Sequence, residues 1–400
     1  MRTISGPWRR AAAGAGLLDA DGYSAPTIFA EMSALAARTG AINLGQGFPD
    51  EDGPTEVLEA ARSAIATGVN QYPPGRGIAD LRSAIADHQR RFYGLEVDPE
   101  REVLVTAGAT EALAATILAL VEPGDEVVVF EPFYDAYAAC IALAGARLVP
   151  VALRWPDFQP DLDQLAAAVT DRTRLILVND PHNPTGAVFS PEARAEIVRL
   201  AERHDALIVT DEVYEHLVFD AASHTPIATL PDAAERTITI SSGGKTFSTT
   251  GWKIGWASGP AELIEAVLAV KQFLTYVNGA PFQPAIATGL RLEDAFFAGL
   301  AASLADKRDL LGEGLRAAGF VVSRPAGSYF TVADAAPLGA ADAHEFCRSL
   351  PERAGVVSVP LTAFVTTEHR SEYATLVRFA ACKRVEVLRE AADRLAQVER

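Results

Sequence analysis

The middle of the chain alternates between short apolar runs and longer stretches with helical spacing. The runs are continuously apolar, so both faces of each predicted strand are expected to be buried. Strands of this kind, separated by helices, predict an α/β fold with a mostly parallel sheet that helices cover on both faces. The predicted strands span residues 103–106, 126–130, 147–153, 174–178, 206–210 and 237–240.

The chain has 400 residues, which is too long for one ordinary hydrophobic core, so we expect a large and a smaller domain. A long helix predicted over 295–318 is followed by short strands and helices, typical of an α+β unit. The expected division is an N-terminal arm (1–24), a first segment of the small domain (25–50), the large domain (51–290) and the remaining small domain (291–400).

The acidic composition narrows the range of partners. A net charge of −17 argues against nucleic acids and anionic membranes. No apolar run reaches the ~18 residues that a membrane-spanning helix needs. Arg9-Arg10 precedes a short, glycine-interrupted apolar stretch, which we interpret as a mobile arm and not as an export signal.

The cysteines and histidines show no metal-binding spacing. The three cysteines lie far apart without a Cys-x-x-Cys pair, which favours reduced thiols and a cytoplasmic location. The seven histidines include no His-x-x-x-His pair. Spacing alone therefore predicts no metal site.

A single lysine, Lys245, stands in a stretch of small residues from Ser241 to Ser248, directly after a predicted strand. Small residues allow a ligand to approach the backbone, and hydroxyl and N–H groups there can hold a phosphate. A partly desolvated lysine can lose its proton and form a Schiff base. A solvated loop lysine is the alternative that this stretch leaves open.

Polar residues also follow the other predicted strands. Asp211 comes directly after an apolar strand, where a carboxylate is costly to bury unless it is paired, and Tyr214 lies three residues on. Asn183 lies in a turn after another strand, and Gly108 opens a helix after a third. Ligand contacts and ordinary capping or turn roles both fit these positions.

Taken together, the motifs resemble the class I/II aminotransferases, which are enzymes of fold type I that use pyridoxal 5′-phosphate (PLP). The resemblance spans nearly the whole chain and rests on four motifs in the order and approximate spacing of the family. These are Asn183-Pro184-Thr185-Gly186, Asp211-x-x-Tyr214, Ser242-x-x-Lys245 and Val377-Arg378-Phe379.

The finer resemblance is to the kynurenine/glutamine aminotransferase branch. It rests on residues 45–50, 131–134 and 242–256. Within that branch, residues 271–284 are similar to bacterial N-succinyldiaminopimelate aminotransferases. The resemblance implies a homodimer with a large PLP-binding domain.

The resemblance implies how the cofactor ring is held. Lys245 would form the Schiff base with PLP, and Asp211 would keep the pyridine nitrogen protonated. Tyr214 and Asn183 would hydrogen-bond the phenolic oxygen, and Phe133 would stack on the ring. Lys245, Asp211 and Tyr214 are thus the predicted catalytic residues.

The resemblance also implies a phosphate site. Ala109, Thr110, Ser242 and Lys253 would hold the phosphate, with Tyr72 reaching in from the second subunit. Lys253 stands where many members of the family carry arginine, which predicts slightly weaker phosphate binding because lysine acts as a point charge.

For the substrate, the resemblance implies that Arg378 binds the α-carboxylate with two parallel hydrogen bonds. Gly47 would line the same pocket and Asn183 would contact the carboxylate. The resemblance of residues 271–284 implies N-succinyl-L,L-diaminopimelate as the favoured amino donor, with 2-oxoglutarate as acceptor. Asn278 and Gly279, which are expected to open the pocket, also favour this donor. Glutamine, methionine or kynurenine as donor remains open, as does β-lyase activity on cysteine conjugates.

Overall fold

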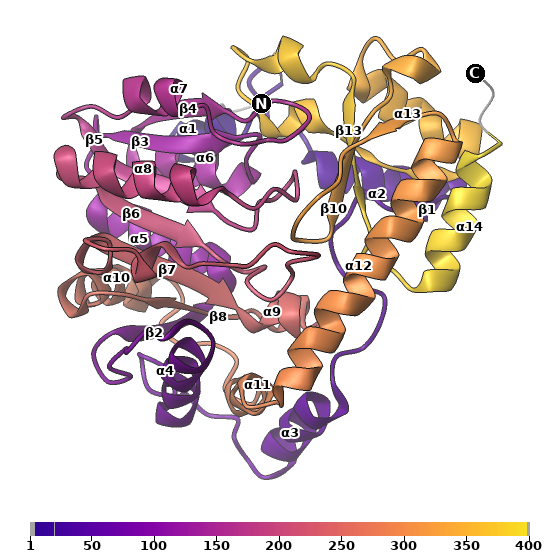
Figure 1. Cartoon of the computed structure of the whole chain (residues 1–400). Helices are drawn as coiled ribbons and strands as arrows, with labels where there is room; N and C mark the ends of the chain where they lie inside the picture. Colours follow the sequence, from indigo (N-terminus) through magenta and orange to yellow (C-terminus); the bar gives the residue numbers. More distant parts are fainter. Residues whose placement is uncertain (1–4, 20, 398–400) are drawn as a thin grey trace.

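A seven-stranded sheet forms the larger part of the molecule (Figure 1), which the computed structural model describes over residues 5–19 and 21–397. The strand order is β2-β8-β7-β6-β5-β3-β4. β8 runs antiparallel to both of its neighbours and the remaining pairs are parallel, which confirms the predicted α/β fold. The strands are β2 (Val103–Ala107), β3 (Glu126–Glu131), β4 (Arg147–Ala152), β5 (Thr173–Asn179), β6 (Leu207–Asp211), β7 (Thr237–Ser242) and β8 (Ile254–Ser258).

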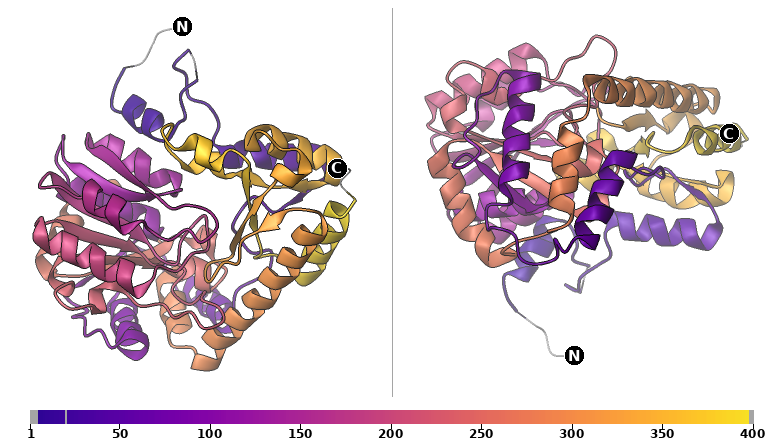
Figure 2. Two further views of the ribbon diagram at one scale, coloured as in Figure 1. Left: turned by 45° about the horizontal axis from the view of Figure 1, so that its top comes forward. Right: turned by 90° about the horizontal axis from the view of Figure 1, so that it is seen from below.

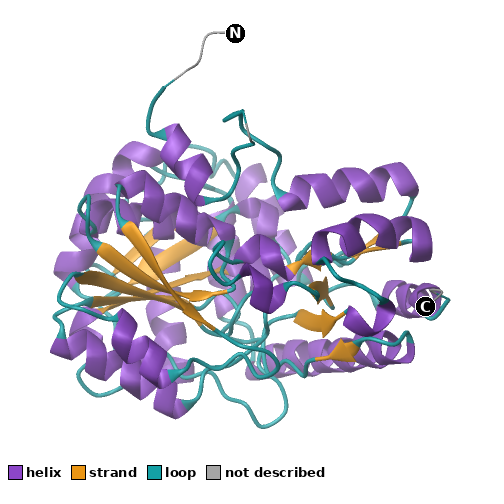
Figure 3. Cartoon of the chain, turned by 90° about the horizontal axis from the view of Figure 1, so that it is seen from above, coloured by secondary structure: helices purple, strands orange, loops and turns teal. Residues whose placement is uncertain are grey.

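Helices cover both faces of this sheet because alternate residues of each strand point to opposite sides. Val127 and Val129 of β3 pack with α5, α6 and α10, whereas Val128 and Phe130 pack with α7 and α8. Figure 3 shows the sheet between these two helical layers. The five helices are α5 (Gly108–Leu120), α6 (Asp135–Ala144), α7 (Leu162–Ala168), α8 (Pro191–Arg203) and α10 (Ala261–Leu274).

A second, smaller unit combines residues from both ends of the chain (Figure 2). β1 pairs in parallel with β11, so that Ile42 lies beside Val356. A four-stranded sheet, β12-β13-β10-β9, lies next to this pair. The elements are α2 (Ile28–Thr39), β1 (Ile42–Asn43), α12 (Asp294–Ala317), β9 (Val321–Val322), β10 (Phe330–Asp334), α13 (Ala343–Ala354), β11 (Val356–Val357), β12 (Val359–Pro360), β13 (Leu376–Ala380) and α14 (Val385–Leu395). The domain boundaries near residues 50 and 290 remain a proposal.

A third group of helices packs beneath β2 and β8. Trp256 and Val105 form a buried cluster there with α3, α4 and α11. The helices are α3 (Thr55–Ala66), α4 (Ala79–Tyr93) and α11 (Phe282–Leu290); the two short helices are α1 (Trp8–Gly14), which packs on α6, and α9 (Gly243–Thr246).

The sequence analysis identified most of the longer elements. It missed the helices α1, α6, α9 and α11 and the strands β1, β8, β11 and β12. The sequence of residues 261–277 predicts one long helix, but α10 ends earlier, at Leu274, because Tyr276 adopts a positive φ of 63° that no helix continues. The sequence also predicts a terminal helix over 385–398, which corresponds to α14, and its last predicted residue lies outside the described residues. Within 5–19 and 21–397, no helix is both long and apolar enough to cross a membrane.

Candidate active site

A cavity of about 220 Å³ lies at the carboxyl edge of the seven-stranded sheet. Asn179 ends β5, Asp211 ends β6 and Ser242 ends β7, and all three line the cavity. Gly108, the first residue of α5, and Lys253, the residue before the antiparallel strand β8, complete the same wall. Ligands of open parallel sheets bind at this edge, where the strands end in loops that can carry side chains.

Lys245 lies in the turn after β7 and lines the cavity. Its Nζ is 5.8 Å from the centroid of the Tyr214 ring. Burial lowers the pKa of Lys245, and the positive charges of Lys253 and Arg378 lower it further, whereas the Asp211 carboxylate raises it. A lysine in this environment gives up its proton more readily than a surface lysine does.

Small residues precede Lys245 because the turn passes close to α11. A Cβ on Gly243 would lie only 2.7 Å from Cδ1 of Ile286. The glycine therefore allows the chain to leave β7 and bring Lys245 back over the end of the sheet.

The Asp211 carboxylate is buried and only half satisfied. Its Oδ2 accepts a hydrogen bond of 2.6 Å from the Tyr137 hydroxyl, while Oδ1 has no hydrogen-bond partner within residues 5–19 and 21–397. Burial raises the pKa of Asp211, and the Tyr137 hydrogen bond opposes that rise. A buried carboxylate oxygen without a partner is costly, so Oδ1 is suited to a protonated nitrogen of a bound ligand.

Asn179 connects the ends of two neighbouring strands. Its amide nitrogen donates to the Asp211 carbonyl oxygen at 2.7 Å, and its amide oxygen accepts from the Asn183 N–H at 2.7 Å. The Asn179 side chain thus fixes the backbone of both Asp211 and Asn183, which line the same cavity.

The start of α5 forms a cradle suited to an anion. Gly108 has a positive φ of 74°, and a Cβ added to it would lie 3.2 Å from the Lys253 Nζ. A Cβ on Gly255 would lie 2.5 Å from the Gly108 carbonyl carbon, so only glycine fits there. This cradle offers several partners for a phosphate. They are the free N–H groups at the start of α5, the positive charge of Lys253, and the hydroxyl groups of Thr110 and Ser242.

Arg378, on β13, is buried beside this cavity, with 1% of its surface exposed. The guanidinium donates to Asn183 Oδ1 at 3.0 Å and to the Gly45 carbonyl oxygen at 2.7 Å, and its Nε has no partner. Its Cζ lies 4.1 Å from the centroid of the Phe330 ring. Burial lowers the pKa of Arg378 to about 10. A buried guanidinium that is bonded only to neutral oxygens is prepared for an incoming carboxylate.

Comparison with known proteins agrees with this geometry. Residues 39–395 match the family "Aminotransferase class I and II". The chain belongs to this family of aminotransferases.

The relatives of this aminotransferase include a probable N-succinyldiaminopimelate aminotransferase, DapC, from Mycobacterium tuberculosis. The two sequences are 56% identical over 93% of this chain and 96% of the relative. The methionine aminotransferase of Escherichia coli is 40% identical over 93% and 96%. The solved structure of N-succinyldiaminopimelate aminotransferase from M. tuberculosis has a TM-score of 0.93 and 54% identity, and it covers 100% of both chains. The predicted family and enzyme class are thereby confirmed.

Most of the predicted site residues gather at the cavity of this aminotransferase. Arg378 and Gly47 lie next to the cavity. Arg378 bonds to Asn183, which lines it, and the Gly47 carbonyl oxygen accepts a hydrogen bond of 2.6 Å from the Tyr329 hydroxyl. A Cβ at Gly47 would lie 2.4 Å from Cζ of Phe330, which explains the glycine. The predicted residues that line the cavity itself are Ala109, Thr110, Asn183, Asp211, Tyr214, Ser242, Lys245 and Lys253.

Two predicted residues lie elsewhere. Phe133 does not line this cavity, because its neighbour Tyr134 occupies the wall and Phe133 lines a separate cavity beside α1. Tyr134 therefore replaces Phe133 as the aromatic residue placed beside a bound ring. Tyr72 is 81% exposed and does not line the cavity of its own chain.

Sequence reasoning missed three residues of the aminotransferase site. Tyr134 stands next to the predicted aromatic residue, but adjacent side chains leave a strand end in different directions. Tyr137 lies on α6, a helix that was not predicted. Asn179 directly follows the strand predicted over 174–178 and is the last residue of β5, so its position at the carboxyl edge was the available signal.

Proposed function

We propose that this aminotransferase uses PLP and transfers the amino group of N-succinyl-L,L-diaminopimelate to 2-oxoglutarate. The observation that carries the cofactor assignment is the unpartnered Oδ1 of Asp211, on the wall of the cavity that Lys245 also lines. PLP, when bound, supplies an electron sink that stabilises negative charge at the substrate Cα.

The residues of this chain fit the parts of that cofactor one by one. Asp211 Oδ1 would accept the N–H of the pyridine ring, and the Tyr137 hydroxyl would hold the other carboxylate oxygen in place. The start of α5 and Lys253 would hold the phosphate. Tyr214 and Asn183, which line the cavity together with Tyr134, would contact the ring and its phenolic oxygen.

In this proposal Lys245 moves a proton away from the substrate Cα. The lowered pKa of its amine provides a neutral nitrogen that can accept the proton from the substrate Cα and deliver it to another atom. The expected result for Lys245→Ala is a chain that folds but shows no turnover.

Arg378 is assigned the α-carboxylate of the amino acid. Its present acceptors, Gly45 O and Asn183 Oδ1, are neutral, so a carboxylate would be the first negative charge to bond it directly. The free Nε supplies a further donor for a two-point contact. Any amino acid carries this carboxylate, so Arg378 selects the class of substrate and not its side chain.

The active unit in this proposal is a homodimer. Tyr72 stacks edge-on with Tyr276, with ring centroids 5.8 Å apart, and both are exposed. Phe273 is 82% exposed and precedes Tyr276 by three residues, which extends this apolar surface. Exposed apolar surface of this kind favours burial against a partner, here a second copy that would receive Tyr72 at its phosphate site.

Mixing two inactive chains tests the shared site. Chains with Tyr72→Ala and chains with Lys245→Ala, mixed and allowed to exchange, should regain activity, because one site per mixed dimer then has both residues. A fully active monomer at the assay concentration, shown by sedimentation, would refute the proposal.

The choice of donor is supported by the 56% identity to the M. tuberculosis protein over most of both chains. The loop at 276–279, expected to shape the substrate pocket, bears on it as well. Asn278 donates to the backbone oxygens of Thr106 and Lys253, so this loop lies against the phosphate end of the cavity. The three free cysteines support a cytoplasmic setting for the reaction.

A panel of amino donors decides between the candidates. We expect kcat/KM for N-succinyl-L,L-diaminopimelate to exceed that for methionine, glutamine and kynurenine, each measured with 2-oxoglutarate. A tenfold or larger preference for one of the other donors would reject this substrate while leaving the aminotransferase assignment intact. Release of pyruvate from cysteine conjugates at a comparable rate would instead indicate β-lyase activity.

A further inference from the structure

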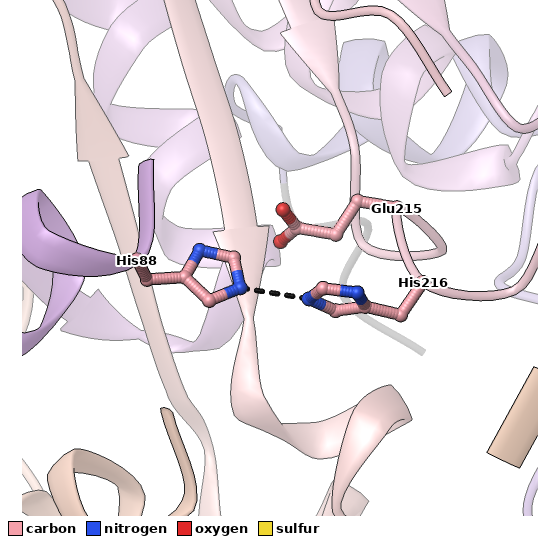
Figure 4. A group of neighbouring side chains, drawn as sticks. All are labelled: His88, Glu215 and His216. Atoms are coloured by element: carbon pink, nitrogen blue, oxygen red, sulfur yellow. Dashed lines mark hydrogen bonds between the residues drawn. The ribbon is translucent and has the colours of Figure 1, made fainter. Parts of the chain in front are cut away.

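The fold brings together three side chains able to bind a metal, behind the cofactor cavity (Figure 4). His88 lies on α4, and Glu215 and His216 lie in the segment that follows β6. The Nε2 atoms of the two histidines are 2.7 Å apart although the residues are separated by 128 positions in the sequence. One ligating atom from each of the three residues lies within 4.8 Å of the other two.

The cluster is enclosed by aromatic side chains. The His216 ring lies 4.3 Å from the Phe297 ring and 4.8 Å from the Phe92 ring, measured between centroids. The nearest cation, Arg91, stacks on Phe92 at 4.9 Å and is bonded to the Asp294 carboxylate. His88 and Glu215 are 2% and 4% exposed. Such an enclosure disfavours an isolated charge, whereas a bound ion is stabilised by its ligands and by the negative charge of the Glu215 carboxylate.

The Glu215 carboxylate has one oxygen bonded within the protein and one oxygen available to a ligand. Glu215 Oε1 accepts a hydrogen bond of 2.6 Å from Ser241 Oγ, and Oε2 has no hydrogen-bond partner among the described residues. The Tyr93 hydroxyl lies near this carboxylate, whose charge adds to burial in raising the pKa of Tyr93.

The distance between His88 Nε2 and His216 Nε2 would have to increase for a metal ion to bind both atoms. At 2.7 Å they are close enough to share one proton in a hydrogen bond. Tetrahedral zinc with Zn–N bonds of about 2.0–2.1 Å would place them roughly 3.3 Å apart, so the rings need to separate by about half an ångström. Small ring rotations provide that shift, and the ion would take the place of the shared proton.

We propose that His88, Glu215 and His216 form a buried zinc site with a water molecule as the fourth ligand. Two imidazoles and one carboxylate are a donor set that suits Zn²⁺. The ion would join α4 to the segment that begins with Asp211 and Tyr214, and so would hold one wall of the cofactor cavity in place. The expectation of no metal site rested on local spacing, which cannot detect ligands that only the fold brings together.

Zinc content measured on tag-free protein tests the proposal directly. Since the donors are buried, the ion should enter during folding, so the chain is produced in zinc-supplemented medium. We expect about one zinc per chain after gel filtration. Crystals of the same protein should give an anomalous peak, present only above the zinc absorption edge, between the two Nε2 atoms.

Single variants assign the ligands. His88→Gln and His216→Gln should each lower the zinc content by about tenfold or more. The matched control is His204→Gln, since His204 bonds to the exposed Asp171 and lies outside the cluster. Circular dichroism and the melting temperature show whether each variant has folded.

The wild-type measurement alone can overturn the proposal, even if a variant fails to fold. A chain that carries less than about 0.1 zinc after expression and after refolding with added zinc would show that the two histidines only share a proton. A folded variant that carries both His88→Gln and His216→Gln and still retains zinc would place the ion elsewhere, which would equally refute the site. Neither readout depends on the amino donor, so the two proposals fail independently.

Discussion

Replacement of Arg378 should weaken the use of every amino donor to a similar degree. The guanidinium is buried, stacks on Phe330 and bonds only Gly45 O and Asn183 Oδ1 within the protein. In Arg378→Ala, a substrate α-carboxylate would enter this buried space with no charged partner. Removing one member of a buried ion pair costs roughly 2–5 kcal/mol, which corresponds to about a 30-fold to several-thousand-fold loss in kcat/KM.

Arg378→Lys separates charge from geometry. Lysine keeps a positive charge but cannot form two parallel hydrogen bonds or stack flat on Phe330, so it should recover only part of the loss. Because alanine also leaves Gly45 O and Asn183 Oδ1 without donors, the melting temperature of each variant must be measured alongside the kinetics.

The assay is kcat/KM for donors with small, apolar and acidic side chains, each at saturating 2-oxoglutarate. A uniform loss fits a role at the α-carboxylate, which all donors share. A loss confined to donors with acidic side chains would show that Arg378 binds the far end of the substrate, and the reasoning from its neutral partners would then be wrong.

Further predictions concern the cofactor cavity. Lys245→Ala should remove turnover and the near-ultraviolet or visible absorbance of lysine-bound PLP, with an unchanged circular dichroism spectrum; residual turnover would refute its role. Tyr137→Phe removes the hydrogen bond that the Tyr137 hydroxyl donates to Asp211 Oδ2. A hydrogen bond to a charged group contributes about 1.5–3 kcal/mol, so the pH profile of kcat should shift, and an unshifted profile would contradict this positioning role. Since burial lowers the pKa of Lys245, PLP capture by the cofactor-free enzyme should speed up as the pH rises through a midpoint below the ~10.4 of free lysine. Between the lowered pKa of Lys245 in the folded chain and its ordinary pKa in the unfolded chain, the unfolded chain binds more protons. The free energy of unfolding should therefore increase with pH across that interval. A midpoint at or above ~10.4 would contradict the lowered pKa of Lys245.

Much of the site was predictable because it depends on local sequence. Asp211 and Ser242 end strands whose apolar runs are plain, and the carboxyl ends of parallel strands always share one edge. The small residues around Lys245 likewise indicated a tight turn. β8 was missed because Ile254–Ser258 contains glycine and serine. Its antiparallel direction depends on pairing with β7 and with β2, and β2 lies far from it in sequence.

The features that the sequence could not predict concern side-chain direction and long-range contact. Phe133 and Tyr134 are both aromatic and adjacent, and only the folded backbone decides which ring faces the cavity. The meeting of His88 with His216 depends on how α4 packs against the segment after β6. Neither fact leaves a signal in spacing or composition.

The pairing of Ile42 with Val356 has a consequence for synthesis of the chain on the ribosome. Strand β1 is made early but finds its partner only after most of the polypeptide has emerged, which makes this contact late and slow to form. The large sheet is complete once Ser258 has emerged, so it can fold first. We expect ribosome-bound chains stalled near residue 330 to resist proteolysis in the sheet while their first 50 residues are still cleaved. Protection of both regions at that length would contradict this order. Gly45, which accepts a hydrogen bond from Arg378, belongs to the segment that docks late, so the proposed carboxylate site would be the last part of the enzyme to form.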